Sequence, residues 1–173
     1  MRIRFGPAGI PLSCKGKGTI DGIKYTADEG LDAFEVEFVR GVRMSIENAK
    51  EVGEIARERD VLLSCHCPYW INCCPEKEEK REIAIRNILQ TARVAKAMKA
   101  WVIVFHPGYY MKRSPKEAKK IVLKTLEKVL EDMHGEGIYD VNLGLETTGK
   151  NSQLGTLEEV ISLSTLLDQV VPV

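Results

Sequence analysis

Short β-branched runs alternate with longer amphipathic runs along this 173-residue chain, and that rhythm leaves few folds open. The strand-like runs are Ile3–Phe5, Ala33–Phe38, Val61–His66, Trp101–His106 and Val141–Glu146, with a last stub at Val170–Val173. The helix-like runs, in which apolar residues recur every three or four positions, are Thr19–Glu29, Ser45–Arg59, Pro75–Met98, Ser114–His134 and Thr156–Leu167. Strands and helices that alternate without hairpin signals predict right-handed βαβ units and a parallel α/β sheet.

Two architectures fit this order: an open doubly wound sheet, and a (β/α)₈ barrel of the TIM type. A barrel needs about 250 residues, or roughly 30 for each unit, so this chain would supply about five and a half units and stop inside a sixth strand. The sequence contains no linker, low-complexity tract or shift of composition. We therefore expect residues 1–173 to form a single, partial barrel domain.

Composition excludes several classes of protein. The 25 Lys and Arg residues balance 25 Asp and Glu residues, which argues against a protein that coats nucleic acid non-specifically. No run approaches the roughly 18 apolar residues of a membrane span, so we expect no membrane partner. The 5 cysteines are odd in number and no export signal precedes them. We therefore expect a reducing compartment, the cytoplasm.

Three neighbouring strands end in side chains that can bind a metal: His66, His106 and Glu146. Side chains alternate between the two faces of a strand, so each of these residues shares a face with the residues two and four positions before it. The carboxyl ends of parallel strands form the active face of α/β folds, so two imidazoles and one carboxylate should converge there. Two His and one Glu with an open position form a standard catalytic zinc set.

Other interpretations of these motifs remain. A single His at a strand end is commonly a structural hydrogen-bonding residue. The pattern Cys65-x-Cys67…Cys73-Cys74 is a rival zinc site, although small buried side chains are the simpler interpretation. Gly16-Lys17-Gly18-Thr19 lacks the spacing of a phosphate-binding Walker motif. Glu35 and Glu37 share one face of a strand, and the sequence assigns them no role.

Charge is sorted between the two ends of the predicted sheet. The loops that follow the strands contain cations and no Asp or Glu: Lys15, Lys17, Arg40, Arg43, Lys112, Arg113 and Lys150. Two aromatic residues, Tyr69 and Trp70, follow His66 in one of these loops, where they are either exposed or packed under the loop. A positive rim with aromatic side chains around a metal suits a polyanion or phosphate ester, and such aromatics can stack on bases. Loop charges that merely bind solvent are the alternative.

Three strand-end motifs resemble those of the endonuclease IV family. They are His66-Cys-Pro-Tyr69-Trp-Ile-Asn72, Phe105-His106-Pro107-Gly108 and Leu145-Glu146-Thr-Thr-Gly149-Lys-Asn-Ser-Gln-Leu-Gly155. The resemblance covers nearly the whole chain and is most specific in the last motif. It implies a xylose-isomerase-like TIM barrel that uses three zinc ions to hydrolyse the phosphodiester 5′ of abasic sites in damaged double-stranded DNA.

The same resemblance implies roles for individual residues. His66, His106 and Glu146 would bind zinc, and Glu146 would bridge two ions. Tyr69 and Trp70 would lie in a loop that intrudes into DNA, and Arg40 or Arg43 in another loop that reaches the DNA. On charge alone, Lys112, Arg113 and Lys150 join the expected DNA-binding set.

The sequence also departs from the family pattern. The family's remaining metal ligands lie on three later strands, whereas this sequence ends at Val171-Pro172-Val173. We therefore expect an apparently truncated barrel that retains one metal subsite and has weak or no nuclease activity alone. Its open sheet edges would favour a homo-oligomer. A sugar isomerase or epimerase of the same superfamily and a non-catalytic remnant of the barrel are the competing functions.

Overall fold

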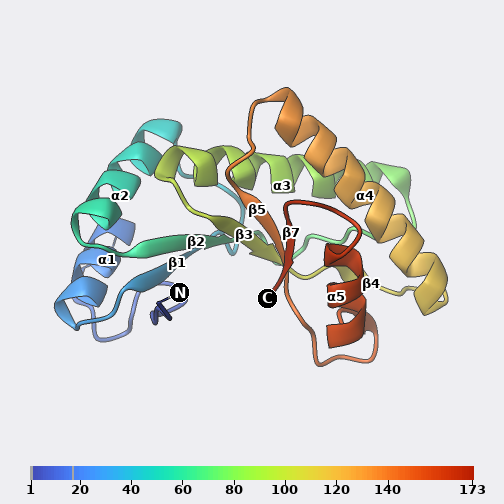
Figure 1. Ribbon diagram of the computed structural model, residues 1–173, viewed down its shortest axis with the longest axis horizontal. Coiled ribbons are helices and arrows are strands. Elements are labelled where there is room, and N and C mark those ends of the chain that lie inside the picture. The colour runs from blue at the N-terminus through green and yellow to red at the C-terminus, as the bar shows by residue number, and fades with distance from the viewer. Residues whose placement is uncertain (1, 17) are drawn as a thin grey trace.

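The structure is a computed structural model that describes residues 2–16 and 18–173. Helices and strands alternate along the chain, as Figure 1 shows. The helices are α1 (Thr19–Asp28), α2 (Ile46–Glu58), α3 (Glu78–Met98), α4 (Pro115–Gly135) and α5 (Leu157–Ser164). The strands are β1 (Ala33–Glu37), β2 (Leu62–His66), β3 (Val102–Phe105), β4 (Gly108–Tyr109), β5 (Asn142–Leu145), β6 (Gln153–Leu154) and β7 (Val170–Pro172).

The main sheet is parallel and runs in chain order, β1-β2-β3-β5-β7. The helices arch around one side of this sheet, and both chain ends lie toward its other side (Figure 1). A doubly wound sheet would carry helices on both faces, so the arrangement is that of an open, incomplete (β/α) barrel. The predicted fold class is therefore confirmed.

The hydrophobic core lies between the sheet and the helices. Alternate strand residues such as Phe34, Cys65, Ile103 and Leu143 face the helices and are almost fully buried. The residues between them face the inner side of the curved sheet. Register aligns His66 with Val104 on the neighbouring strand, so residues two positions beyond Val104 point to the same inner side. This parity brings the strand-end side chains to one face.

The predicted strand Ile3–Phe5 is wrong. Residues 2–7 form no strand; instead an isolated bridge joins Ala8 to Glu35 on β1. Pro7 has no N–H to donate, and the Phe5 N–H bonds the Asp32 side chain, so a regular ladder cannot continue. The segment still lies against β1, because Glu35 donates its N–H to the Pro7 carbonyl.

Helix starts are set by capping. Ser114 and Thr156 form capping boxes with Glu117 and Glu159, and their hydroxyls accept bonds from the first turns of α4 and α5. The predicted helix from Pro75 begins only at Glu78. The residues just before Glu78 stay outside the helix, because Arg113 donates hydrogen bonds to the carbonyls of Cys74 and Pro75.

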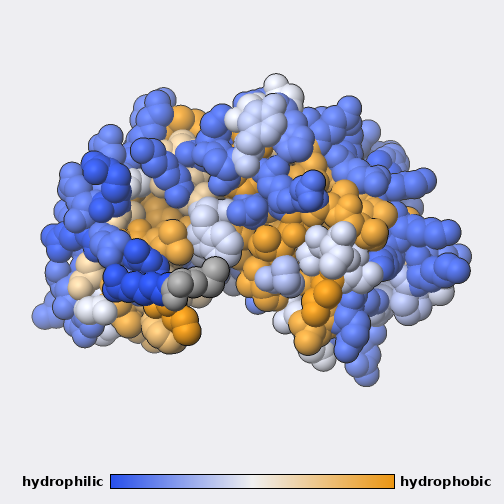
Figure 2. All heavy atoms as spheres, in the orientation of Figure 1, coloured by the Kyte–Doolittle hydropathy of each residue, from blue (hydrophilic) through white to orange (hydrophobic). Residues whose placement is uncertain are grey.

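No helix in residues 2–16 and 18–173 combines the length and apolar character that spanning a membrane requires. The open side of the sheet appears in Figure 2 as a notch between two lobes with hydrophobic residues on both flanks. The N-terminal segment and α5 lie on either side of this notch (Figure 1). Both carry exposed large hydrophobic residues, including Phe5 and Leu157.

Candidate metal centre

Three side chains from neighbouring strands meet at the carboxyl edge of the sheet. His66 ends β2, and His106 and Glu146 follow β3 and β5 by one residue. Their ligand atoms lie within 4.8 Å of one another, and the three are the one such metal-competent cluster among residues 2–16 and 18–173. The convergence follows from the parallel register, because each side chain points to the inner face of its strand.

One carboxylate oxygen is shared by both imidazoles. Glu146 Oε2 lies 3.2 Å from His66 Nε2 and 3.5 Å from His106 Nδ1. The two imidazole rings lie edge to face with their centroids 5.8 Å apart. His66 is buried, whereas His106 and Glu146 are about one-third exposed. The arrangement therefore has a closed inner wall and an open side through which a further ligand can approach.

Hydrogen bonding fixes the proton on His66. Its Nδ1 lies 2.7 Å from the carbonyl oxygen of Cys67, which can only accept, so Nδ1 carries the proton. In the neutral ring, Nε2 then presents a lone pair to Glu146 Oε2, which is also an acceptor. An imidazole whose other nitrogen is tied to a carbonyl is the usual form of a metal-ligating histidine.

The third donor atom lacks a partner. His106 Nδ1 is buried and makes no hydrogen bond within the described part of the chain. Lone pairs that face one another without an intervening donor are unfavourable unless a proton or a cation lies between them. Imidazole nitrogens and a carboxylate suit zinc and related divalent ions, so the three residues fit such a metal.

Two more carboxylates lie on the inner face of β1, and no sequence motif assigns them a role. Glu35 accepts a hydrogen bond from Ser64, and Glu37 lies 3.5 Å from the Tyr69 hydroxyl. Burial raises the pKa of Glu35, and the nearby charges of Glu37 and Glu146 raise it further. The available signal was the alternation Glu-Val-Glu, because Glu37 pairs in register with His66.

The two predicted aromatic residues differ in their relation to this site. Tyr69 and Trp70 are each about half exposed. The Tyr69 ring packs on His66 with a centroid separation of 5.0 Å. Trp70 lies beside Gly41, whose positive φ is a backbone conformation that favours glycine. Tyr69 therefore borders the metal-competent cluster, whereas Trp70 lines a separate cavity beside the start of α3.

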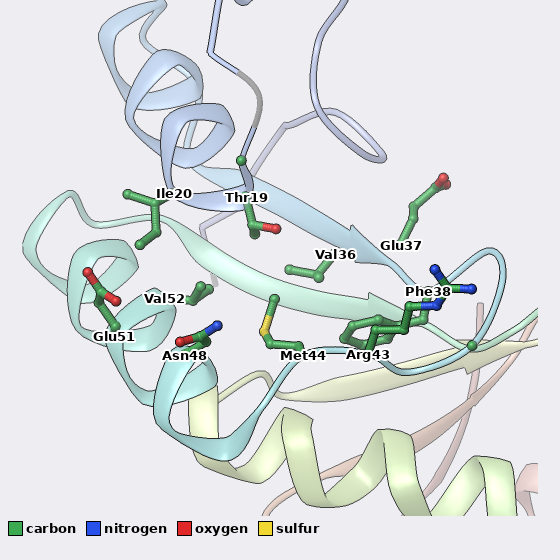
Figure 3. A pocket seen from close by; sticks show the side chains of 12 residues that line it. Thr19, Ile20, Val36, Glu37, Phe38, Arg43, Met44, Asn48, Glu51 and Val52 are labelled. Carbon is green, nitrogen blue, oxygen red and sulfur yellow. The ribbon is translucent and has the colours of Figure 1, made fainter.

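The predicted cations occupy different surroundings. Arg43 lines a cavity of about 480 Å³ between the first turn of α1, the end of β1 and α2 (Figure 3). Arg40, Lys112 and Lys150 are exposed. Arg113 is partly buried, and its guanidinium donates hydrogen bonds to the carbonyls of Cys74 and Pro75 in the loop before α3. Lys17 lies outside the described residues.

No cysteine takes part in a metal-competent cluster within residues 2–16 and 18–173. Cys65, Cys67, Cys73 and Cys74 are buried and free of disulfides. Burial raises the pKa of Cys67 to about 12, which opposes the thiolate form that a metal requires. Cys65 also faces away from His66, toward Met98 on α3. These side chains therefore belong to the core under the loop that carries Tyr69.

Comparison with known proteins identifies the family. Residues 23–171 match the model of the xylose isomerase-like TIM barrel family, and the chain belongs to that family. An uncharacterized protein of Methanocaldococcus jannaschii is 35% identical over 92% of this chain and 56% of its own. A probable endonuclease 4 of Aster yellows witches'-broom phytoplasma is 31% identical over 68% of this chain and 41% of its own. The predicted resemblance to the endonuclease IV family is thereby confirmed.

Solved structures share the fold. Endonuclease IV from Thermus thermophilus superposes with a TM-score of 0.65 and 23% identity, covering 95% of this chain and 61% of its own. D-Psicose 3-epimerase from Clostridium cellulolyticum superposes with a TM-score of 0.74 and 15% identity, covering 91% of this chain and 57% of its own. The chain spans about half the length of the curated relatives that it matches.

Proposed function

We propose that this chain carries part of the active site of a metal-dependent phosphodiesterase that cleaves damaged double-stranded DNA 5′ to abasic sites. One observation carries the proposal: two imidazole nitrogens and a carboxylate oxygen from three neighbouring strands lie within 4.8 Å of one another, and the His106 nitrogen has no hydrogen-bond partner among the described residues. The names of the endonuclease 4 relatives support the choice of DNA as the substrate.

The residues of this chain have distinct tasks in the proposal. His66 is oriented by the Cys67 carbonyl, so its Nε2 lone pair faces the site. Glu146 offers one oxygen to both imidazole neighbours and leaves the other free for a further contact. A zinc ion held here would supply Lewis acidity and activate water. His106 completes the set from the solvent side.

The surroundings of the metal-competent cluster suit a nucleic acid. Arg40 and Arg43 follow β1, and Tyr69 and Trp70 follow β2, so all four project from the same end of the sheet. Cations contact phosphates, and aromatic rings stack on unpaired bases. Free buried cysteines are compatible with action in the cytoplasm, where thiols stay reduced.

A nicking assay tests the proposal. The substrate is a duplex with one abasic site, and the proteins are this chain and a barrel completed with the later segment of the Methanocaldococcus jannaschii relative. Each is assayed with and without zinc, beside Glu146→Gln and the exposed control Glu158→Gln. We expect zinc-dependent nicking that Glu146→Gln abolishes and Glu158→Gln retains, and that is weaker in the shorter chain. A completed barrel that binds zinc but leaves the duplex intact would refute the proposed nuclease function.

The carboxylates on β1 favour a second candidate, a sugar isomerase or epimerase. Glu35 and Glu37 line the inner face beside the metal-competent cluster, where they would repel a phosphodiester but accept hydrogen bonds from sugar hydroxyls. Such an enzyme would exchange a carbon-bound proton of a ketose with solvent. Proton NMR of D-tagatose in deuterated water, with the completed barrel and a divalent metal, would detect that exchange.

A further inference from the structure

The two loops that follow His106 and Glu146 are tied together. Strands β4 and β6 pair antiparallel, with Gly108 opposite Leu154 and Tyr109 opposite Gln153. The ladder extends through a bond of 3.1 Å from the Tyr110 N–H to the Ser152 carbonyl. This pairing holds the turn at residues 149–152 against the loop that follows His106.

A cavity of about 430 Å³ opens beside this turn. Its lining includes Arg113, Thr148, Gly149, Lys150 and Asn151. Arg113 is fixed by hydrogen bonds to two loop carbonyls, and Lys150 is exposed. The cavity therefore combines a guanidinium held by hydrogen bonds with an exposed ammonium group.

The turn that lines this cavity has backbone donors without an acceptor among the described residues. Thr148 Oγ1 also lacks a partner, but it is closed off from solvent beside Gly155. The structure records no partner for the backbone N–H groups of Gly149, Lys150 and Asn151 within the described residues. The carboxylates at the neighbouring helix starts are already engaged: Glu159 accepts from Tyr110 and Thr156, and Glu117 accepts from Ser114.

We propose that this cavity is a phosphate-binding subsite. Unpaired backbone N–H groups and two cationic side chains are donors that phosphate oxygens accept from in proteins. Thr148 follows Glu146 by two residues, so their Cα atoms are at most roughly 7.6 Å apart. The subsite thus adjoins the metal-competent cluster and would hold a phosphate next to the reacting one.

Its assignment to a DNA backbone phosphate rests on the proposed function. The terminal phosphate of a sugar phosphate offers the same oxygens. The two sources differ in how binding depends on salt, because each neutralised DNA phosphate releases counterions.

Inorganic phosphate tests the subsite without any assumption about DNA. Amide chemical shifts of the whole chain are followed by NMR as phosphate is added at constant ionic strength. We expect saturable chemical-shift changes at residues 148–151. Lys150→Ala should weaken the phosphate affinity obtained from them at least about fivefold. The changes should persist in Lys124→Ala, which removes an exposed lysine from the outer surface of α4. Shifts that spare residues 148–151, or that survive Lys150→Ala unchanged, would overturn the subsite.

Duplex DNA with an abasic site, and a ketohexose phosphate, then distinguish the sources. In EDTA, log K for DNA should fall with log salt concentration, and Lys150→Ala should reduce the slope by about 1. An unaltered slope, together with displacement of phosphate by the ketohexose phosphate, would keep the subsite and overturn its assignment to DNA. A phosphate subsite without nicking activity would instead remove the proposed nuclease function.

Discussion

Glu146 is the residue on which the candidate metal centre depends most. Its Oε2 atom is the shared neighbour of both imidazole nitrogens, so it defines where a cation would lie. Replacing it by Gln keeps the size but substitutes an uncharged amide for a carboxylate. We expect Glu146→Gln to lower zinc affinity by about 100-fold or more, since loss of an outer-shell partner alone costs 10–100-fold. Isothermal titration with zinc measures this, and Glu158→Gln should bind as the unsubstituted chain does.

Glu35 provides a pH-dependent prediction. Burial raises its pKa, so the folded state binds its proton more tightly than the unfolded state does. Its favourable contribution is complete below the ordinary pKa of a glutamic acid and is lost as pH rises through the raised value. We expect Glu35→Gln, measured in EDTA, to raise the melting temperature at pH 8 by about 2 °C and to have no such effect at pH 3. An equal gain at both pH values would contradict the assignment.

Among the elements, α2 and α3 make an unusually close approach. Gly53 lies in the interior of α2, and a Cβ atom there would come within 2.5 Å of the Met98 carbonyl oxygen at the end of α3. Although Ala is the better helix former, we expect Gly53→Ala to destabilise the chain by about 1–3 kcal/mol. Urea denaturation measures it. Gly135→Ala is the matched control, because no atom lies within 4 Å of its added Cβ.

The sequence predicts the helices and strands well where local signals determine them. The five helices and the strands β1, β2, β3 and β5 lie where periodicity and capping residues place them, within a few positions. The parallel order also aligns His66, His106 and Glu146. The β4–β6 ladder was missed because two-residue strands from separate loops leave no periodic pattern. The environment of Glu35 cannot be predicted from the sequence, because its burial and its hydrogen bond from Ser64 are tertiary properties.

The whole molecule has an open side. Strand β7 is an edge of the main sheet, and apolar residues flank the adjoining notch (Figure 2). Unpaired edge groups and exposed apolar surface favour association with another chain. We therefore expect the 173-residue chain by itself to self-associate, with a mass above 19.4 kDa that rises with concentration. Multi-angle light scattering measures the mass, and a concentration-independent value of one chain would contradict the expectation.

The alternation of inner and outer side chains along β2 also determines whether a nitrogen or a sulfur atom would face a metal. His66 is flanked by Cys65 and Cys67, which point into the helical layer. Removing one residue from β2 would rotate the strand end by half a period and present sulfur in place of imidazole. A deletion that leaves the composition almost untouched would thus exchange a borderline nitrogen donor for a soft thiolate and shift the preference toward ions such as Cu(I).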